Sequence, residues 1–377
     1  MMKITKYLYA VALGASSMMV TSCFNAEQEF PDFQDGTTAY FAYQDPVRTL
    51  ILGNDIYDNT IDNEHKCHIY ATMGGAYNGR NAVVQFDVDP TLCDNLFFTD
   101  EAGNVAEKVQ PMPTSYYKLA SNNISYNGDV RGYVEVQFTD AFFNDPLSVK
   151  NTYVIPLLMK NVTGIDHILT GQAREGLTPA RTDADGWEVL PKDYVLYCVK
   201  YMNPWQARYI RRGVDKVTEA GVTNEVIRKD MSLFNSDPNR YTENPVNAND
   251  EIVSATTMNM NQVVLPVSFK RANGQASVSC NLILTFNGNQ CTITTADDGK
   301  KVVGKGEFIP EGTALPAYKD YQWGNMNGQT VKRDILRLAY DVDFGDGAIK
   351  VSTADTLVVQ TRESNKKVFF SPTYVKP

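Results

Sequence analysis

The richest concentration of side chains able to do chemistry is the segment "KDYQWGNMNGQT" at residues 319–330. It combines the flat rings of Tyr321 and Trp323 with the amides of Asn325 and Asn327. Aromatic rings can cover the apolar faces of a sugar, and amides can bond to its hydroxyl groups. Because binding residues concentrate in loops carried by rigid scaffolds, this Gly-containing segment is a candidate glycan-binding loop.

Two further tryptophans have different expected roles. Trp187, in "DGWE", is a second candidate glycan platform or a plug between two domains. Trp205, in "NPWQARYIRRG" (203–213), is expected to pack structurally at the start of a second domain. For every aromatic residue of this kind, partial burial in a core is the alternative, since Tyr and Trp are amphipathic and mostly buried.

The motif "HKCH" at residues 65–68 has the residue types of a metal site. In a strand, His65 and Cys67 share one face while His68 points to the other. Two ligands do not complete a tetrahedral zinc site, and no CxxC or HExxH motif supplies the others. The sequence therefore predicts no metal ligands here.

The motif "DVDFGDG" at residues 341–347 is similar to the start of a calcium loop. Asp341 and Asp343 fit the first two ligand positions. Gly345 then removes a ligand, and Asp346 stands where the loop requires glycine. We expect a hairpin turn after a strand, and neither a metal nor another cofactor.

Sequence motifs for catalysis are absent. The chain has no GxSxG nucleophile elbow, no GxxxxGK[ST] phosphate loop and no GxGxxG after a strand. Carboxylates are plentiful, and a glycosidase pair can be distant in sequence, so the alternative of a scattered-carboxylate enzyme stays open. We assign no catalytic residue.

Residues 1–22 have the parts of a secretory signal peptide. Lys3 and Lys6 form a positive n-region, and "YLYAVALGASSMMV" (7–20) is an uncharged, mostly apolar run. A run of this length is short for a membrane-spanning helix, which needs about 20 residues. We expect cleavage directly after this segment, as in an exported protein.

Cys23 follows the signal segment directly and is preceded by the small residue Ser22. This arrangement resembles a bacterial lipobox, in which the cysteine is acylated and becomes the mature N-terminus. The resemblance predicts a lipid anchor at Cys23, the alternative being ordinary secretion. Glu27 and Glu29 resemble the acidic signal that exports Bacteroidetes lipoproteins to the outer face of the outer membrane.

Composition disfavours a nucleic-acid or anionic-lipid partner. The 377 residues carry a formal net charge of −9, and a protein of this kind lacks the basic surface that such partners require. The densest basic stretches are "YIRRG" (209–213) and "NKK" (365–367), which we interpret as solvated strand ends.

An odd number of cysteines, five, follows Cys23, so at least one is unpaired. Cys280 and Cys291 flank a predicted hairpin. With Asn287 and Gly288 as its turn, Cys291 faces Leu284, and the two cysteines are offset by roughly 13 Å, beyond the roughly 7 Å that a disulfide spans. We interpret all five as buried thiols.

Strand signals dominate the chain, with residues such as Val, Tyr, Phe and Thr in alternating patterns that are typical of half-buried antiparallel strands. One segment, residues 218–231, could carry a helix. The predicted strands lie at 82–88, 132–140, 152–160, 193–201, 261–270 and 355–363.

The sequence predicts a mostly β protein of two domains. After a signal peptide (1–22) and an acylated tether (23–35), we expect an immunoglobulin-like β-sandwich at 36–170. Residues 171–193, rich in Gly, Pro and charge, are expected to be a linker. An antiparallel β-barrel or second sandwich is expected at 194–377.

The chain resembles the two-domain surface lipoproteins encoded in Bacteroidetes polysaccharide-utilisation loci. The resemblance lies in the lipobox, in "YVIPLLMKNVTGID" (153–166), in "NPWQARYIRRG" and in "DTLVVQTRE" (355–363). In that family, an N-terminal domain of unknown function, also found ahead of some endo-glycosidases, precedes a β-rich domain. The resemblance implies an outer-membrane surface location but no particular ligand-binding residues.

Three functions follow, in order of preference. The first is non-catalytic binding of a polysaccharide or glycoprotein glycan beside a TonB-dependent transporter and its partner lipoprotein. The second is a glycosidase or peptidase whose acidic residues are scattered along the sequence. The third is an adhesin or assembly protein that binds other surface proteins through exposed strand edges.

Overall fold

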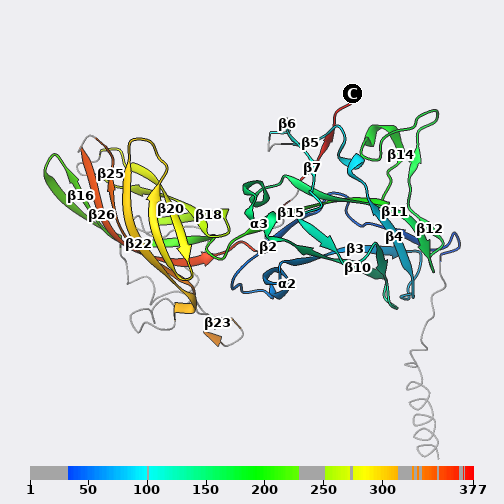
Figure 1. Ribbon diagram of the computed structural model, residues 1–377, viewed down its shortest axis with the longest axis horizontal. Helices are drawn as coiled ribbons and strands as arrows, with labels where there is room; N and C mark the ends of the chain where they lie inside the picture. The colour runs from blue at the N-terminus through cyan, green and yellow to red at the C-terminus, as the bar shows by residue number, and fades with distance from the viewer. Residues whose placement is uncertain are drawn as a thin grey trace, which may run out of the picture.

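The protein is built almost entirely from β-strands. The computed structural model describes residues 33–99, 102–228, 251–271, 275–312, 325–326, 329–330, 333–345, 348–364, 368 and 370–377. Strands account for 56% and helices for 8%, in a curled sheet and a closed eight-stranded barrel (Figure 1). The predicted fold class is confirmed. None of the helices formed by the described residues is both long enough and apolar enough to cross a membrane.

The N-terminal domain is one large sheet that curls on itself. Most neighbouring strands are antiparallel, but β1 pairs with β12, β2 with β15, and β7 with β11 in parallel. In spatial order its strands are β12 (His167–Ile168), β1 (Thr38–Tyr40), β3 (Lys66–Gly74), β10 (Arg131–Phe138), β9 (Asn123–Ser125), β4 (Val83–Val88), β11 (Tyr153–Thr163), β15 (Tyr194–Met202) and β2 (Val47–Ile51), with β7 (Gln110–Pro111) and β8 (Tyr117–Leu119) beside β11 and β10.

Short elements complete the chain outside the large sheet. Two- and three-stranded sheets contain β13 (Gln172–Ala173) with β14 (Trp187–Val189), β23 (Asn325–Met326) with β24 (Gln329–Thr330), and β27 (Thr373–Tyr374) with β5 (Leu96–Thr99) and β6 (Val105–Lys108). The described helices are α2 (Thr60–Asn63), α3 (Asp140–Asn144), η1 (Pro90–Cys93), η2 (Pro146–Val149), η3 (Ala184–Gly186) and η7 (Pro310–Gly312). These helices are one turn long and only connect strands.

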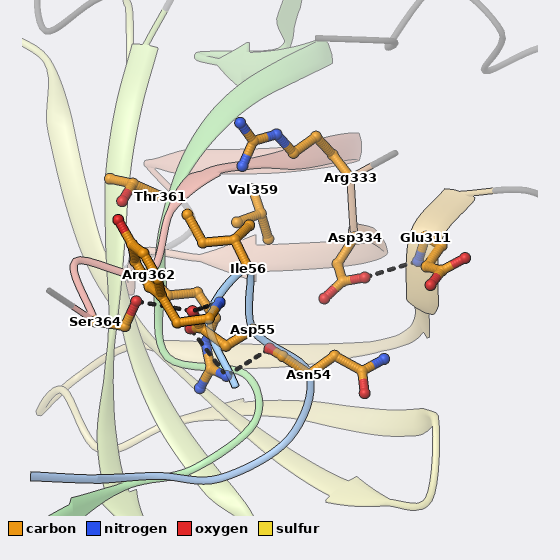
Figure 2. A pocket seen from close by; sticks show the side chains of 11 residues that line it. Asn54, Asp55, Ile56, Glu311, Arg333, Asp334, Val359, Thr361, Arg362 and Ser364 are labelled. Atoms are coloured by element: carbon orange, nitrogen blue, oxygen red, sulfur yellow. Dashed lines mark hydrogen bonds and ion pairs between the residues drawn. The ribbon is translucent and has the colours of Figure 1, made fainter. Parts of the chain in front are cut away.

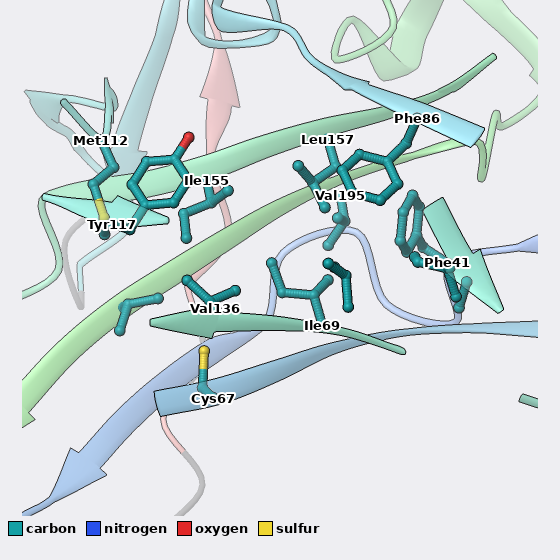
Figure 3. Close-up of a cluster of buried hydrophobic side chains, with 14 of the residues drawn as sticks. Phe41, Cys67, Ile69, Phe86, Met112, Tyr117, Val136, Ile155, Leu157 and Val195 are labelled. Atoms are coloured by element: carbon teal, nitrogen blue, oxygen red, sulfur yellow. The ribbon is translucent and has the colours of Figure 1, made fainter. Parts of the chain in front are cut away.

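The two halves of the curled sheet enclose the core of the N-terminal domain (Figure 3). Cys67 and Ile69 of β3 and Val136 of β10 pack with Ile155 and Leu157 of β11. The pleat explains the arrangement, because alternate residues of β3 point inward and the others outward. Full burial of one such aliphatic side chain contributes about 1.5–3 kcal/mol. This two-layer packing is the one expected for the N-terminal domain.

The outward face of β11 and β15 is covered as well, which explains their almost unbroken apolar sequences. Val154, Leu196 and Cys198 pack there with Phe370 from the C-terminal segment. Strand β27, which follows Phe370, pairs with β5. The C-terminal residues therefore return to the N-terminal domain.

The expected boundary between the domains is corrected by this topology. Strand β15, predicted to open the second domain at residue 194, lies inside the first sheet between β11 and β2. Residues 171–193 hold the hairpin of β13 and β14 and do not lead into a new domain. The chain passes into the barrel at residues 203–206, directly after β15.

The C-terminal domain is a closed antiparallel barrel, as one of the two predicted alternatives stated. Strand β16 closes the barrel by pairing with β18 on one side and with β26 on the other. Strand β17 pairs with the part of β16 that extends beyond β18. The strands are β17 (Val222–Arg228), β16 (Ala207–Glu219), β18 (Glu251–Asn259), β19 (Gln262–Phe269), β20 (Val278–Asn287), β21 (Gln290–Thr295), β22 (Lys301–Ile309), β25 (Ile335–Asp343) and β26 (Ile349–Thr361).

The prediction of a helix at residues 218–231 is wrong. Strand β16 ends at Glu219 and β17 begins at Val222, so the described part of this segment is a hairpin. Ala220 and Gly221 form its turn with positive φ angles of 49° and 82°. Gly adopts such angles without strain, and the β-branched residues that follow favour a strand. Residues 229–231 lie outside the described part of the chain.

All five cysteines of the described residues are free and buried, as predicted. The register of the hairpin that carries Cys280 and Cys291 differs from the expected one. Its turn lies at residues 288–289, so Cys291 stands opposite Phe286 and not opposite Leu284. The offset from Cys280 is therefore larger than expected, and the conclusion against a disulfide between them is unchanged.

Buried ion pairs form one part of the barrel interior. Arg211 donates from Nε to Asp355 at 2.7 Å, and Arg228 donates from Nη2 to Asp215 at 2.6 Å and to Asp355 at 3.1 Å. Tyr340 donates its hydroxyl to Asp355 at 2.9 Å. The interpretation of "YIRRG" as a solvated strand end is therefore wrong, because Arg211 and its neighbour Arg212 are both buried.

One arginine fixes the junction between the domains. Arg362 follows β26 and donates to the carbonyls of Leu52 (2.8 Å) and Asn54 (2.8 Å) in the N-terminal domain. It also donates to the carbonyls of Asn203 (2.7 Å) and Gln206 (3.2 Å) in the connection from β15 to β16. Four carbonyls that no sheet pairs are thereby satisfied by a single guanidinium group.

We expect Arg362→Ala to lower the free energy of unfolding by about 2–4 kcal/mol, because buried carbonyls lose a charged donor. Protease cleavage at residues 203–206 should increase as well. Urea unfolding and limited proteolysis would measure both effects. Arg208→Ala is the control, since Arg208 and Glu363 form a partly exposed pair at 3.5 Å and its loss should cost under about 1 kcal/mol. Equal effects of the two substitutions would contradict the role of Arg362.

Candidate functional site

The predicted aromatic and amide loop falls largely outside the described residues. Tyr321, Trp323 and Asn327 all lie there. Asn325 belongs to β23, where its backbone pairs with Thr330. The loop therefore stays a prediction.

Trp187 is described, and its environment is local. It begins β14, its Nε1 donates to the carbonyl of Ala180 at 2.9 Å, and the guanidinium of Arg181 lies 5.4 Å from its ring centre. Both its polar atom and its ring are thus engaged within the hairpin region. Trp205 packs on the barrel core as expected, with its ring stacked on Phe286 at 4.0 Å.

A pocket of about 190 Å³ lies where the open end of the barrel meets the N-terminal domain (Figure 2). Loop 54–57 enters from the N-terminal domain, and segments beside β25 and β26 complete the walls. The lining residues are Asn54, Asp55, Ile56, Tyr57, Glu311, Arg333, Asp334, Val359, Thr361, Arg362 and Ser364. In the sequence, Glu311 stands eight residues before the predicted glycan-binding loop at 319–330, and Arg333 stands three residues after it.

The carboxylates of this interdomain pocket hold its backbone. Asp55 accepts from the Ser364 hydroxyl at 2.9 Å and from the backbone N–H of Tyr57 at 3.1 Å. Asp334 accepts from the backbone N–H of Glu311 at 2.7 Å (Figure 2). Burial raises the pKa of the Asp334 carboxyl above its ordinary value. The pocket can accept a small polar group, and one oxygen of each of these two carboxylates already accepts a hydrogen bond, whereas the buried Oδ2 of Asp55 accepts none.

A second candidate site lies on the outward side of β3 and β10, on the face of these strands opposite the core. We call it the tyrosine face. Tyr70 and Tyr133 are cross-strand neighbours with ring centres 5.4 Å apart, and they are 46% and 48% exposed. His68 stacks on Tyr133 at 4.0 Å. Three flat rings thus lie together on two paired strands.

Charged side chains border these rings. The guanidinium of Arg131 lies 5.4 Å from the Tyr70 ring centre. Glu135 stands opposite His68, with 3.8 Å between its Oε2 and the His68 Nε2, and Lys66 approaches Glu135 at 3.5 Å. Hydrogen-bonding groups therefore surround an exposed aromatic surface.

A hollow of about 820 Å³ lies at the other end of β3. Its lining includes three aromatic residues, three glycines, a glutamine and an aspartate. The hollow is lined by Phe33, Gln34, Asp35, Gly36, Thr38, Tyr40, Gly74, Gly75, Ala76, Tyr77 and Leu169.

The candidate metal motifs have other roles. Cys67 is buried in the core, and His68 is part of the tyrosine face. Asp343 ends β25 and accepts from the backbone N–H of Gly345 at 3.0 Å, in the predicted hairpin turn between β25 and β26. Within the described ranges, no group of three or more His, Cys, Asp and Glu side chains could hold a metal ion.

The tyrosine face was not identified from the sequence. The signal for it was present, since alternation in "KCHIYATMG" and "RGYVEVQF" places His68, Tyr70 and Tyr133 on the polar side of their strands. Only the pairing of β3 with β10 brings the rings together, and about sixty residues separate the two strands in the sequence.

Two family models match the chain. Residues 204–363 match a domain of unknown function, DUF5627, and residues 33–166 match a model described as "-like, N-terminal domain". A Bacteroides ovatus protein of unknown function, solved by crystallography, is 37% identical, with a TM-score of 0.76 over 91% of this chain and 100% of that chain. The chain belongs to the family of that Bacteroides ovatus protein.

More distant solved structures are similar only at low scores. A multidomain protein including DUF1735, from Bacteroides ovatus, is 10% identical over 86% of this chain and 94% of that one, with a TM-score of 0.37. An auxiliary nutrient binding protein from Bacteroides thetaiotaomicron is 10% identical over 83% and 90%, with a TM-score of 0.33. No curated protein matches the chain.

The raised pKa of Asp334 predicts how the interdomain pocket responds to pH. A carboxyl whose pKa is higher in the folded state stabilises the protein below its ordinary pKa, near 4, and this stability is lost as pH rises through the folded-state pKa. Asp334→Asn keeps an acceptor for Glu311 and removes the charge. We expect it to raise the free energy of unfolding by about 1 kcal/mol at pH 8 and to leave it unchanged at pH 3.5.

Urea unfolding at the two pH values would measure this difference. Asp341→Asn, on the exposed side of β25, is the matched control and should change neither value by more than about 0.5 kcal/mol. A loss of stability of the Asp334 variant at pH 8 would contradict the prediction, because the charged form would then be the stabilising one.

Proposed function

We propose that the protein binds glycans without catalysing a reaction and that the tyrosine face is its binding surface. The observation that carries this proposal is the pair of exposed rings, Tyr70 and Tyr133, held opposite each other on two central strands and bordered by Arg131 and Glu135. Such rings cover the apolar faces of sugars, and the charged groups bond to hydroxyls at the edges.

Physical considerations support modest affinity at this site. An open face on a sheet buries only one side of a ligand, so much of the ligand stays hydrated. We expect micromolar to millimolar dissociation constants for each site, which correspond to about −8 to −4 kcal/mol. Several copies anchored on one surface would hold a long polysaccharide far more tightly than one copy.

The proposed setting is the outer surface of a bacterial outer membrane. A lipid on Cys23 would hold the protein there, beside a TonB-dependent transporter and its partner lipoprotein that take up the bound polysaccharide. Acyl chains contribute about 0.8 kcal/mol for each buried CH₂ group, so several chains give stable anchoring.

Tyr70→Ala and Tyr133→Ala should each weaken glycan binding about tenfold, which corresponds to about 1.4 kcal/mol for a lost ring contact. Affinity electrophoresis of the mature chain through gels cast with starch, mannan, xylan, cellulose derivatives and glycoproteins would measure this loss of affinity. Both side chains are exposed, so stability should change by about 0.5 kcal/mol or less.

Control variants separate the tyrosine face from the other candidates. Tyr57→Ala tests the interdomain pocket, and Trp187→Ala and Trp323→Ala test the residues expected from the sequence. Free migration of the folded wild-type chain in every gel would contradict glycan binding and favour a protein partner. Release of reducing ends that Asp334→Asn abolishes would favour the glycosidase alternative.

Acylation at Cys23 has its own test. In cells labelled with a palmitate analogue, the wild-type chain should carry the label and sediment with membranes, whereas Cys23→Ser should lose both properties. Ser22→Ala keeps a small residue before the cysteine and should remain labelled. Labelling of the Cys23→Ser variant would refute the anchor.

A further inference from the structure

We propose that the tyrosine face and the neighbouring hollow form one continuous strip that binds an extended, neutral, linear glycan along β3. This inference rests on the proposed function and adds the length and charge of the ligand. Neither was evident from the sequence, because the residues involved come from three strands and two turns.

The strand register places both features on the same side of the sheet. His68, Tyr70, Thr72 and Gly74 alternate with the buried residues of β3 and share its outward face. Gly74 pairs with Thr38 in β1, and a Cβ added at Gly74 would lie 3.4 Å from the Tyr40 ring. The hollow therefore begins where the tyrosine face ends.

The length of the strip exceeds that of a disaccharide. Six residues separate His68 from Gly74, and a strand rises about 3.3 Å for each residue, so the strip extends roughly 20 Å along β3. Tyr77 and Phe33, which are 69% and 63% exposed, continue it beyond Gly74.

The sequence of groups along the strip suits a chain of sugar rings. Tyr77 and Tyr40 supply aromatic surface in the hollow, and Tyr70 and Tyr133 supply it on the tyrosine face. Between them stand Thr72 and Arg131, which are directly paired across β3 and β10. Each aromatic surface can cover one sugar, and the polar groups between them can bond to hydroxyls.

The charges of the strip favour a neutral ligand. The positive charges of Lys66 and Arg131 are offset by Asp35 and Glu135, and Lys66 already forms ion pairs with Glu64 at 3.2 Å and with Glu135 at 3.5 Å. A uronic acid polymer would gain no net attraction from such a surface. This balance distinguishes a neutral polysaccharide from an anionic one.

Glycines keep the hollow open. Gly75 has a φ angle of +84°, and a Cβ there would lie 2.5 Å from the carbonyl oxygen of Gly36. Gly74 has ordinary backbone geometry, so a side chain can be added at this position and would project beside the Tyr40 ring. Gly74→Leu therefore fills the hollow without straining the turn.

The experiment is titration calorimetry of the mature chain with disaccharides and hexasaccharides. The probes are maltose and maltohexaose, cellobiose and cellohexaose, mannobiose and mannohexaose, and hexagalacturonate as the anionic comparison. We expect one neutral hexasaccharide to bind at least tenfold more tightly than its disaccharide and more tightly than hexagalacturonate.

The variants locate the added affinity. Tyr77→Ala and Gly74→Leu should each weaken the hexasaccharide about tenfold and leave the disaccharide unchanged, whereas Tyr70→Ala should weaken both. Tyr43→Ala, at an exposed tyrosine outside the strip, is the control. Thermal unfolding of each variant confirms that it is folded.

The outcomes separate this inference from the proposed function. Equal affinity for both lengths, no effect of Tyr77→Ala and Gly74→Leu, or preference for hexagalacturonate would overturn the extended neutral strip. If Tyr70→Ala still weakened binding about tenfold in those cases, glycan binding at the tyrosine face would stand. Failure of the wild-type chain to bind any of the probes would overturn the extended neutral strip, and together with free migration in every gel it would overturn both.

Discussion

The arrangement of the two domains depends on the pairing of backbone carbonyls where the chain crosses between them. Two crossings lie side by side, after β15 and after β26, and neither belongs to a sheet there. Asn203 is buried at the first crossing and donates to the carbonyls of Asn259 and Gln262, both at 2.9 Å. Arg362 comes from the second crossing and donates to the carbonyl of Leu52 in the N-terminal domain and to that of Asn203 in the first crossing. Arg362 also lines the interdomain pocket, so these bonds join the two domains directly beside it.

The same requirement governs the barrel interior. Arg211 and Arg228 carry charge into a closed barrel, and burial of an unpaired charge costs several kcal/mol. Asp355 offsets this cost by accepting from both arginines, and Asp215 accepts from Arg228 and lies 3.7 Å from Arg211. Tyr340 donates to Asp355, and Thr353 donates to Asp215. The local sequence does not predict these ion pairs, because Asp355 lies 144 residues from Arg211. A short basic stretch therefore resembled a solvated strand end until its partners were known.

Local pattern predicted the strands well because the pleat imposes it directly on the sequence. Alternation in β10 and β19 and the continuous apolar run of β11 all correspond to the faces that these strands bury. Domain boundaries failed because β15 takes its partners from β2 and β11, and a strand does not encode its neighbours. The hairpin of β16 and β17 failed because Ala220 in its turn resembles a helical residue, although its φ is positive. The tyrosine face was missed for the same reason as the domain boundary, because its rings come together only when β3 pairs with β10.

A binding surface on central strands has different physical properties from one on loops. Strand β3 is paired on both sides, with β1 and β10, so its outward side chains have fixed spacing before any ligand arrives. Little backbone entropy is lost on binding, which compensates for the small area that an open face can bury. In the proposed function, fixed spacing would make selectivity depend on how well the repeat of a polymer matches the positions of the rings.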